Sequence, residues 1–535
     1  MAGAPIPETA ATAGAAREVP AAIDQPSAGY ARYVLTLLVI VYVLNFIDRQ
    51  IISILAEDIK RDLGLTDADL GFLYGTAFGV FYALFGIPLG RLADNWNRVK
   101  LMSIGLAVWS AATAVSAFAR TGGMLAGARI GVGVGEATAS PCAYSLISDY
   151  FPKEKRATAL AIYSSGLYIG GGLSLFIGGL IVQQWNAAYP GGGPLGLVGW
   201  QAAFLAVGIP GLLLAAIVAT LREPLRGQAD GLITPPSDRP FRSFFDELLT
   251  VVPPLTLIGA AKRGMAALAI NVLVAAMIAA TVYLLIQLMG PTSWLQWSAV
   301  GIGVYAVFSW ATAIRRRDPP TYKLIWGTPA FLCAVVGYGL IALLAYSTSF
   351  WSVPYAERLL GISKAEAGFI LGGIGAGGGF LGVVLGGQLA DALRRTRPSG
   401  RVIVMLAGLV LPIVPMLIGF TTREPVLFYL MVAIAQVTSS MALGAAAATT
   451  QDLVLPRMRG AATATFCLGT TLVGLAMGPY MAGFLSQAFG DLGYGVIALL
   501  AVVPLSLVAL LYLYRALPAA EASRLDRARA AGEAI

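Results

Sequence analysis

Long apolar runs recur along almost the whole chain and leave little room for a soluble core. Fourteen of these runs are long enough to approach the roughly 20 residues that carry a helix across a bilayer. Only helices and closed barrels span lipid, and these runs are too long and continuous for barrel strands. Of the 535 residues, 57% are hydrophobic and only 12% are charged, whereas about 25% are charged in soluble domains. The chain is therefore predicted to be an all-α polytopic membrane protein. The runs begin near Tyr33, Leu70, Leu101, Met124, Thr158, Trp200, Gly264, Trp294, Pro329, Ala367, Val402, Pro425, Gly460 and Gly493.

Lysine and arginine are distributed unevenly between the two sides of these runs. With the N-terminus placed inside, the tails and loops of that side carry 28 of the 36 basic residues, the opposite loops carry 6, and only Arg49 and Arg129 lie within spans. Basic loops are typical of the cytoplasmic side. We therefore expect a multi-pass protein of the cell (inner or plasma) membrane with both termini in the cytoplasm. Residues 1–28, poor in large apolar side chains, are predicted to be a disordered cytoplasmic tail, and residues 517–535 a second cytoplasmic tail. Because the net charge of +8 comes from short loops, nucleic acid is not expected as a partner.

The chain contains an internal repeat. Residues 69–94 read DLGFLYGTAFGVFYALFGIPLGRLAD, and residues 366–391 read EAGFILGGIGAGGGFLGVVLGGQLAD. Aligned at an offset of 297 without a gap, 8 of the 26 positions are identical. A weaker echo relates the region after Arg156 to the region after Arg459. Two homologous six-helix halves are predicted, over 29–222 and 329–516.

Two apolar runs are left over between these halves. They are separated only by the turn Gly290–Ser293, and basic residues lie before and after the pair. The segment 223–328 is therefore predicted to be a cytoplasmic linker with an inserted transmembrane hairpin, which brings the total to fourteen transmembrane helices. Since the repeat is complete without the hairpin, the hairpin is expected to be dispensable for the core fold.

Charged side chains within spans are costly, so each one is a hypothesis about function. The first span carries Asn45, Asp48 and Arg49, and the fourth carries Arg129 and Glu136, which lie seven residues apart on one helix face. The chain has no histidine, so a transmembrane proton relay would use Asp48 and Glu136. Burial and a neighbouring arginine act on the proton affinity of a carboxylate in opposite directions, which lets a conformational change load and unload a proton. The alternative is static ion pairing between helices.

Metals and cofactors are not predicted. The three cysteines lie inside apolar runs without the spacing of a metal site, and histidine is absent. A polytopic membrane enzyme, which would need a nucleophile, metal or cofactor cluster near a membrane face, is the remaining alternative of a different class. We expect the chain not to be an enzyme.

A charged loop follows the second span and reads GRLADNWNRVK, residues 90–100. Asp94 and Arg98 in this loop, with Asp149 at the end of the fourth span, are predicted to form a cytoplasmic gate whose ion pairs break when that side opens. The second half repeats the pattern with Asp391 and Arg394. A solvated basic loop without a gating role is the alternative.

The loop resembles the signature loop of the major facilitator superfamily, except that Asn95 replaces a usual basic residue and Asn97 a usual glycine. Within that superfamily the chain resembles the Spinster family in NFIDRQ of the first span, in the DNWNR form of the loop, and in RIGVGVGEATASPCAYSLISDYFPKEKRATAL across the fourth and fifth spans. The similarity is clearest over residues 40–180.

This resemblance implies two six-helix halves around a central cavity that work by alternating access. It implies substrates such as lysophospholipids or sphingosine-1-phosphate, and proton coupling. By motif, Asp48, Arg49, Arg129 and Glu136 match the family's functional charged positions. The chain is thus predicted to be a monomeric, proton-coupled secondary active transporter of amphipathic, lipid-like molecules, with protons and membrane lipids as its other partners. A drug exporter or organic-anion transporter of the same superfamily is the alternative.

Overall fold

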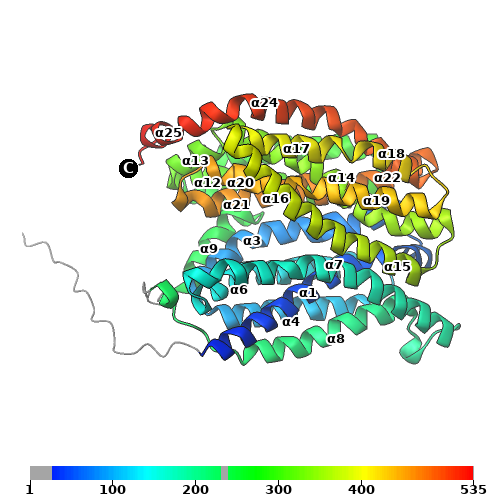
Figure 1. The fold of residues 1–535 in the computed structure, drawn as a ribbon. Coiled ribbons are helices and arrows are strands. Elements are labelled where there is room, and N and C mark those ends of the chain that lie inside the picture. The colour runs from blue at the N-terminus through cyan, green and yellow to red at the C-terminus, as the bar shows by residue number, and fades with distance from the viewer. Residues whose placement is uncertain (1–26, 231–238, 534–535) are drawn as a thin grey trace, which may run out of the picture.

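The apolar runs form the helices of a computed structural model, which describes residues 27–230 and 239–533. The part of the chain that the structure describes is helical and contains no strand. Helices from the first and the second half of the sequence form two separate bundles stacked against each other (Figure 1). The predicted tail over residues 1–28 lies outside the described residues, apart from its last two. We call the face where α1 begins and α24 ends the terminal face.

The first half contains the six predicted spans, of which the fourth is broken. Its α5 and α6 are 15 and 12 residues long and are interrupted at Ala137 and Thr138. The elements are α1 (Ala28–Leu63), α2 (Asp67–Gly71), the π-helix η1 (Phe72–Thr76), α3 (Ala77–Asn95), α4 (Arg98–Ser116), α5 (Gly122–Glu136), α6 (Ala139–Tyr150), α7 (Lys153–Ala188), η2 (Pro194–Gly196) and α8 (Gly199–Ala219).

The second half has the same order of spans. Its elements are α14 (Pro329–Leu360), α15 (Lys364–Gly373), the π-helix η5 (Ile374–Gly378), α16 (Gly379–Thr396), α17 (Gly400–Val410), α18 (Ile413–Gly419), α19 (Pro425–Ser440), α20 (Ala442–Asp452), η6 (Pro456–Met458), α21 (Arg459–Gly469), the π-helix η7 (Thr470–Leu475), α22 (Gly478–Phe489), α23 (Leu492–Ala498), η8 (Leu499–Val502), α24 (Val503–Ala522) and α25 (Arg524–Ala530).

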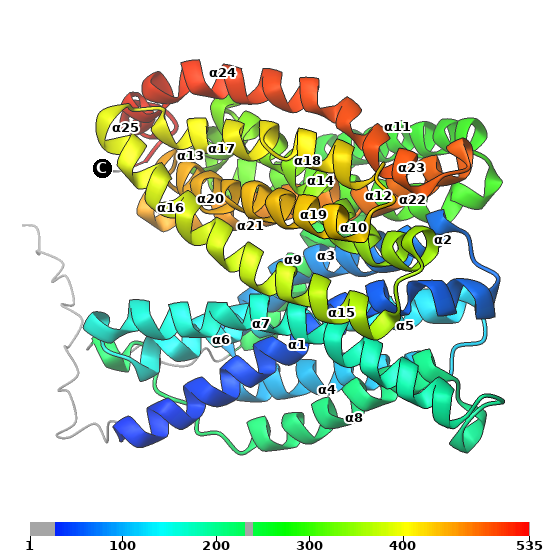
Figure 2. The same ribbon diagram turned by 45° about the vertical axis from the view of Figure 1, so that its right-hand side comes forward.

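The segment between the halves contains the predicted hairpin and two further short helices that precede it. Turned by 45°, the molecule shows α11 and α12 beside the second half (Figure 2). The elements are η3 (Gln228–Asp230), α9 (Pro240–Val251), α10 (Leu255–Lys262), α11 (Met265–Met289), η4 (Pro291–Ser293), α12 (Trp294–Arg317) and α13 (Pro319–Ile325). Thirteen helices of the described residues are long and apolar enough to cross a membrane, or fourteen if α9 and α10, bent by 100°, count as one. The polytopic α-helical fold is confirmed.

The repeat is visible in the turns that join the first two spans of each half. Gly64 ends α1 in the left-handed region, with a φ of 64°, and Thr66 caps α2. At the positions 297 residues later, Gly361 ends α14 with a φ of 67° and Ser363 caps α15. A positive φ favours glycine because it has no Cβ, so the same chemistry makes the same turn twice.

The halves meet directly on the side away from the terminal face. A Cβ on Gly71 would lie 2.3 Å from the carbonyl oxygen of Pro479. At the equivalent position of the second half, a Cβ on Gly368 would lie 2.3 Å from the carbonyl oxygen of Leu175. Only glycine permits such an approach of two backbones. Packing of α2 on α22 and of α15 on α7 therefore closes the molecule on this side.

Candidate functional site: a central cavity and its charged core

A cavity of about 820 Å³ lies between the halves and opens at the terminal face. Tyrosines of the first half, Tyr42, Tyr82 and Tyr144, form part of its wall. Apolar residues of α21, including Leu468, form the wall opposite, and Trp310 of α12 belongs to the wall as well. The charged residues at the mouth include Arg91, Asp94, Arg317 and Arg457. The cavity is thus aromatic and apolar inside and charged at its entrance.

Two charged residues of the first half pair next to the inner end of this cavity. Arg49 of α1 donates to Glu136 of α5 at 2.8 Å. The guanidinium group also lies 4.6 Å from the ring centre of Phe78 and 4.9 Å from that of Tyr82. The Arg49 side chain is 15% exposed, whereas Glu136 is fully buried. Arg49 is not itself a residue of the cavity wall, but it lies directly behind Tyr82, which is.

Asp48 and Arg129 form the deeper part of the same charged core. The Thr113 hydroxyl lies 2.6 Å from both carboxylate oxygens of Asp48. Arg129 is fully buried and donates to the backbone carbonyl oxygen of Asp48 at 3.4 Å. Its Nε and Nη2 have no hydrogen-bond partner among the described residues, and neither has Oε1 of Glu136. Buried polar groups are nearly always satisfied, so this core has unused hydrogen-bonding capacity.

The charged residues predicted from the sequence thus come together. The residues Asp48 and Arg49 of α1 meet Arg129 and Glu136 of α5, and the fifth predicted residue, Asn45, is buried one helical turn before Arg49. Their roles stay predictions. The ion pair joins α1 to α5, because the seven-residue spacing places both charges of α5 on the face that α1 covers.

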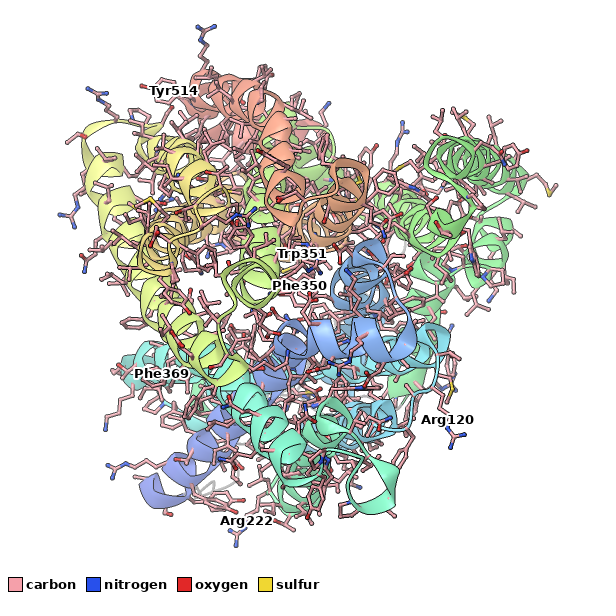
Figure 3. The ribbon with its side chains drawn as sticks, turned by 90° about the vertical axis from the view of Figure 1, so that its right-hand side faces the viewer. Arg120, Arg222, Phe350, Trp351, Phe369 and Tyr514 are labelled. Carbon is pink, nitrogen blue, oxygen red and sulfur yellow. The ribbon has the colours of Figure 1, made fainter. Side chains whose placement is uncertain are left out.

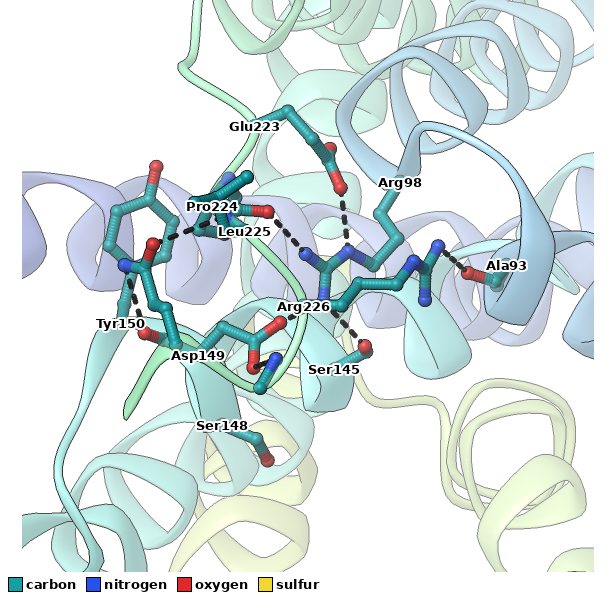
Figure 4. Close-up of polar contacts among 12 residues, drawn as sticks. Ala93, Arg98, Ser145, Ser148, Asp149, Tyr150, Glu223, Pro224, Leu225 and Arg226 are labelled. Carbon is teal, nitrogen blue, oxygen red and sulfur yellow. Dashed lines mark hydrogen bonds and ion pairs between the residues drawn. The ribbon is translucent and has the colours of Figure 1, made fainter. Parts of the chain in front are cut away.

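The loop after the second span supplies a second buried cluster, centred on Arg98 (Figure 4). The Arg98 side chain is fully buried and forms an ion pair with Asp149. It also donates to Glu223 at 2.7 Å, to Ser145 at 2.7 Å and to the Pro224 carbonyl oxygen at 2.9 Å. One guanidinium group therefore ties together the start of α4, the end of α6 and the stretch that follows α8.

The structure does not place this cluster across the opening between the halves, and its gating role stays a prediction. The Arg98–Asp149 pair is intact although the cavity beside it is open at the terminal face. Every hydrogen-bond partner of Arg98 found in the described residues belongs to the first half or to the stretch directly after it. Asp94 lines the cavity, and no hydrogen bond or ion pair joins it to Arg98 within residues 27–230. The cluster holds one half together and does not cross the opening between the two.

The second half contains an equivalent cluster, at a different arginine from the predicted one. Arg401 pairs with Asp452 and approaches Asp391 at 3.4 Å. Arg394 pairs instead with Glu521 near the end of α24. Arg98 to Arg401 is an offset of 303, as is Asp149 to Asp452. The connection after the second span of the second half is six residues longer, which moves the equivalent arginine away from the ungapped offset of 297.

Ion pairs that do cross between the halves lie on the closed side, where no sequence signal predicted them. Arg358 of α14 donates to Asp67 at 2.8 Å and to Glu57 at 2.6 Å. Lys364 lies 3.3 Å from Asp58, and Ser486 donates to Asp67 at 2.9 Å. These residues sit near helix ends, where they resemble ordinary loop charges. We call Glu57, Asp58, Asp67, Arg358 and Lys364 the closed-side cluster.

Within this cluster, two pairs of equivalent positions of the repeat carry opposite charges. In the first half Lys60 pairs with Asp67 at 2.5 Å. At the positions 297 residues later, Glu357 pairs with Lys364. Two turns of the same shape thus carry opposite charge patterns. This inversion was available in the sequence, because the ungapped repeat aligns Asp67 with Lys364. Opposite charges at equivalent positions attract the two halves.

The end-on view from the closed side places Phe350 and Trp351 near the centre of the molecule (Figure 3). The Phe350 ring stacks on Tyr74 with 4.4 Å between ring centres, and its carbonyl oxygen accepts from Ser53 at 2.7 Å. Trp351 donates from its indole nitrogen to the Pro479 carbonyl oxygen at 3.0 Å. Aromatic packing beneath the closed-side cluster therefore separates the cavity from this face.

Comparisons with known proteins agree with this architecture. A family model described as Major Facilitator Superfamily matches residues 38–356 and 341–534. An MFS-type efflux pump of Mycolicibacterium smegmatis is 25% identical over 456 residues, covering 85% of this chain and 84% of the pump. Protein spinster homolog 1 of Xenopus tropicalis is 24% identical over 484 residues, covering 85% of this chain and 73% of that protein. The crystal structure of a bacterial homolog to the human lysosomal transporter Spinster, in an inward-facing and unoccupied conformation, gives a TM-score of 0.64 at 25% identity, with 94% of this chain and 98% of that chain covered.

Proposed function

This chain is a Spinster-like member of the major facilitator superfamily, and from that premise we propose that it is a proton-coupled secondary active transporter of amphipathic, lipid-like molecules of the lysolipid or sphingolipid type. The observation that carries the proposal is that a partly exposed arginine, Arg49, lies directly behind Tyr82 in the wall of an aromatic and apolar cavity. An amphipathic molecule needs both features in one site.

The head group is assigned to Arg49. A guanidinium group donates two parallel hydrogen bonds to a phosphate or carboxylate, and Arg49 has one buried nitrogen, Nε, without a partner among the described residues. The tail is assigned to the apolar wall, since burying each methylene stabilises the complex by about 0.8 kcal/mol.

Proton coupling is assigned to Glu136 and Asp48. An anionic head group at Arg49 competes with Glu136 for the same guanidinium group, which now binds Glu136 at 2.8 Å. A fully buried carboxylate that loses its cation is costly to keep charged, so it is neutralised by a proton. Asp48, held by Thr113, is the second carrier. Substrate binding and proton binding are thereby linked through one arginine.

Alternating access follows from the position of the contacts between the halves. The closed-side cluster seals one face while the cavity is open at the other. We assign the terminal face to the cytoplasm of the cell membrane on the basis of the basic loops, which makes this conformation inward-facing. We propose that the transporter works as a monomer, because one chain encloses the whole cavity and its core.

A drug exporter is the second candidate, favoured by the similarity to the mycobacterial efflux pump over most of both chains. The two candidates differ in the charge of the head group. An anionic lysolipid uses Arg49, whereas a cationic drug would be repelled by Arg49 and attracted to Glu136.

The experiment is a thermal-shift screen of the purified protein with anionic lysolipids, neutral lysolipids, small polar anions and cationic dyes, followed by transport in liposomes under an imposed pH gradient. We expect stabilisation by anionic lysolipids, weakened by Arg49→Ala, and transport that depends on the gradient. Stabilisation by cationic dyes alone would overturn the lysolipid proposal in favour of the exporter.

A further inference from the structure

The inserted hairpin has two unlike helices. Many side chains of α11 are exposed, among them Leu273, Met277 and Tyr283. By contrast, α12 buries much of its length, including Trp297, Tyr305 and Trp310. The outer helix therefore faces the surroundings, and the inner helix belongs to the core of the protein.

One end of α12 binds both halves at once. Gln296 is 1% exposed; the Thr76 hydroxyl lies 2.6 Å from both its Oε1 and the Ala476 carbonyl oxygen, and its Nε2 donates to that carbonyl oxygen at 3.1 Å. Thr76 belongs to η1 of the first half, and Ala476 follows η7 of the second. Two turns later, a Cβ on Gly303 would lie 2.7 Å from Leu472 and 3.5 Å from Val80. This part of α12 thus lies along the seam between α3 and the η7–α22 region.

The other end of α12 reaches the central cavity. Trp310, Ile314 and Arg317 are all residues of its wall. Arg317 donates to Glu247 of α9 at 2.8 Å, and Glu247 also binds Arg91 of α3 at 3.4 Å. The position of α12 at the cavity is therefore fixed by an ion-pair bridge to the first half.

The opposite seam is built differently. There α7 and α15 meet directly, so that a Cβ on Gly372 would lie 2.5 Å from the carbonyl oxygen of Gly172. At the interface beside α3, α12 is inserted between the two halves, and its Trp310 and Ile314 line the same cavity as Tyr82 and Leu468. The cavity is thus asymmetric, and its extra wall comes from the insertion.

We propose that α12 is a substrate-contacting wall of the cavity, and that Trp310 and Ile314 set the length and bulk of the apolar chain that this protein accepts. The proposal rests on the proposed function for the nature of the ligand. It replaces the expectation that the hairpin is dispensable, because removing α12 would open one wall of the cavity and remove the hydrogen bond from Gln296 to the Ala476 carbonyl oxygen. Trp310 limits the length of the accepted chain for a steric reason, because its indole ring occupies space that additional methylenes of a longer chain would otherwise fill.

The first test measures binding of lysophosphatidylglycerols with acyl chains of increasing length by competition against a fluorescent lysolipid. Trp310→Ala and Ile314→Ala should each move the optimum to longer chains, with an affinity change of about fourfold for each added methylene that the enlarged cavity accommodates. Ile302→Ala is the matched control, because Ile302 lies on the same helix, is 39% exposed and is not a cavity residue. Unchanged chain-length profiles in both variants would overturn the specificity role.

The second test does not depend on the ligand. In a background where Cys142, Cys333 and Cys467 are replaced by serine, cysteines at Ile314 and Ile302 are treated with a charged, water-soluble maleimide. Ile314→Cys should react because it lines a water-accessible cavity, and Ile302→Cys should not, because its exposed side lies within the apolar membrane-spanning part of α12, which a charged reagent does not enter. Failure of Ile314→Cys to react in a folded protein overturns the wall assignment. If Ile314→Cys reacts while the wild type binds no lysolipid, the wall stands and the proposed substrate class is wrong.

Discussion

The two halves of the molecule share one fold but differ in where they carry charge. Within the described residues, every side chain that is both charged and buried precedes the hairpin: Asp48, Asp58, Asp67, Arg98, Arg129, Glu136, Asp149 and Glu247. The second half buries neutral hydroxyl groups instead, such as those of Thr348, Ser352 and Ser486. A repeated backbone therefore does not imply repeated chemistry. The buried ionisable groups thus belong to the first half and the linker that follows it, whereas the charges of the second half lie at its partly exposed helix ends and loops.

The same comparison explains what holds the halves together. Their equivalent turns are built from the same glycine and capping residues, yet the first presents Asp67 where the second presents Lys364. The closed-side cluster exploits this difference, since Arg358 of one half binds Asp67 of the other at 2.8 Å. Similar shape makes the two turns fit, and opposite charge makes them attract.

The largest effect on transport is expected from substitutions of the buried carboxylates, which only the first half has next to Arg49. Asp48→Asn together with Glu136→Gln should reduce the component of transport driven by a pH gradient to the level of empty liposomes, because no other buried carboxylate adjoins the Arg49 side chain among the described residues. Uptake of a labelled lysolipid into proteoliposomes is the measurement. Thr348→Val, a buried hydroxyl of the second half, is the control and should retain coupling. Unchanged pH dependence in the double variant would remove the assignment of coupling to the first half.

The attraction between the halves can be weakened without touching the cavity. Arg358→Ala leaves Asp67 and Glu57 without their cation from the other half, and losing hydrogen bonds to charged groups costs about 1.5–3 kcal/mol. The population open on the closed side should therefore rise by about tenfold or more. Spin labels at Arg120 and Thr421, in loops of the two halves on that side, would report this as a longer distance.

Arg423→Ala is the matched control for this measurement. Arg423 lies on the same side but pairs with Asp491 of its own half, at 3.3 Å. It should leave the distance distribution unchanged. Equal shifts in both variants would mean that the closed side is not held by pairing between the halves.

The loop clusters centred on Arg98 and Arg401 differ in burial, and this difference should affect stability more than transport. The Arg98 side chain is fully buried, whereas Arg401 is 18% exposed and its partner Asp391 is 68% exposed. Breaking a buried ion pair costs about 3–5 kcal/mol, but exposed pairs contribute about 1 kcal/mol or less. Arg98→Ala should thus lower the thermal unfolding temperature much more than Arg401→Ala, with no change in the spin-label distance. Equal destabilisation would contradict the difference in burial.

Much of the fold was predictable because its signals are local or repeated. Apolar runs of bilayer length, basic loops and the ungapped offset of 297 predict the spans and the two halves, while Asp48 and Glu136 stand out because charge is rare inside a span. The break between α5 and α6 was missed, since the apolar pattern continues through it.

The residues that were missed depend on contacts between distant segments. Arg358 and Lys364 look like ordinary loop charges until the halves are packed together. Arg401 was missed because a six-residue extension hides its offset from Arg98. Gln296 is a single amide in an apolar helix, and only the neighbouring backbone of Ala476 gives it a role.

The smallest effect is expected at the contact between the inserted segment and the second half. Asp318, just after α12, accepts from Arg457 of the second half at 2.7 Å and from Thr321 of α13. Burial alone would raise the pKa of the Asp318 carboxyl, but hydrogen bonds from Arg457 and Thr321 outweigh burial and lower the pKa to about 2. A carboxyl whose pKa is lowered on folding stabilises the protein above its unfolded pKa of about 3.9, and this contribution is lost as the pH falls through about 2.

The difference in thermal unfolding temperature between wild type and Asp318→Asn should accordingly be constant from about pH 8 to pH 5, shrink below about pH 4, and approach zero near pH 2. Its size should be modest, because Arg457 is 46% exposed and solvent screens the pair. Asp391→Asn, which removes the more exposed carboxylate at Arg401, serves as the control and should show almost no difference at any pH. If the Asp318→Asn difference already disappears at about pH 5, Arg457 does not hold Asp318 ionised. The inserted segment would then be joined to the second half by apolar packing and by the hydrogen bond from Gln296 to Ala476, without a contribution from an ion pair.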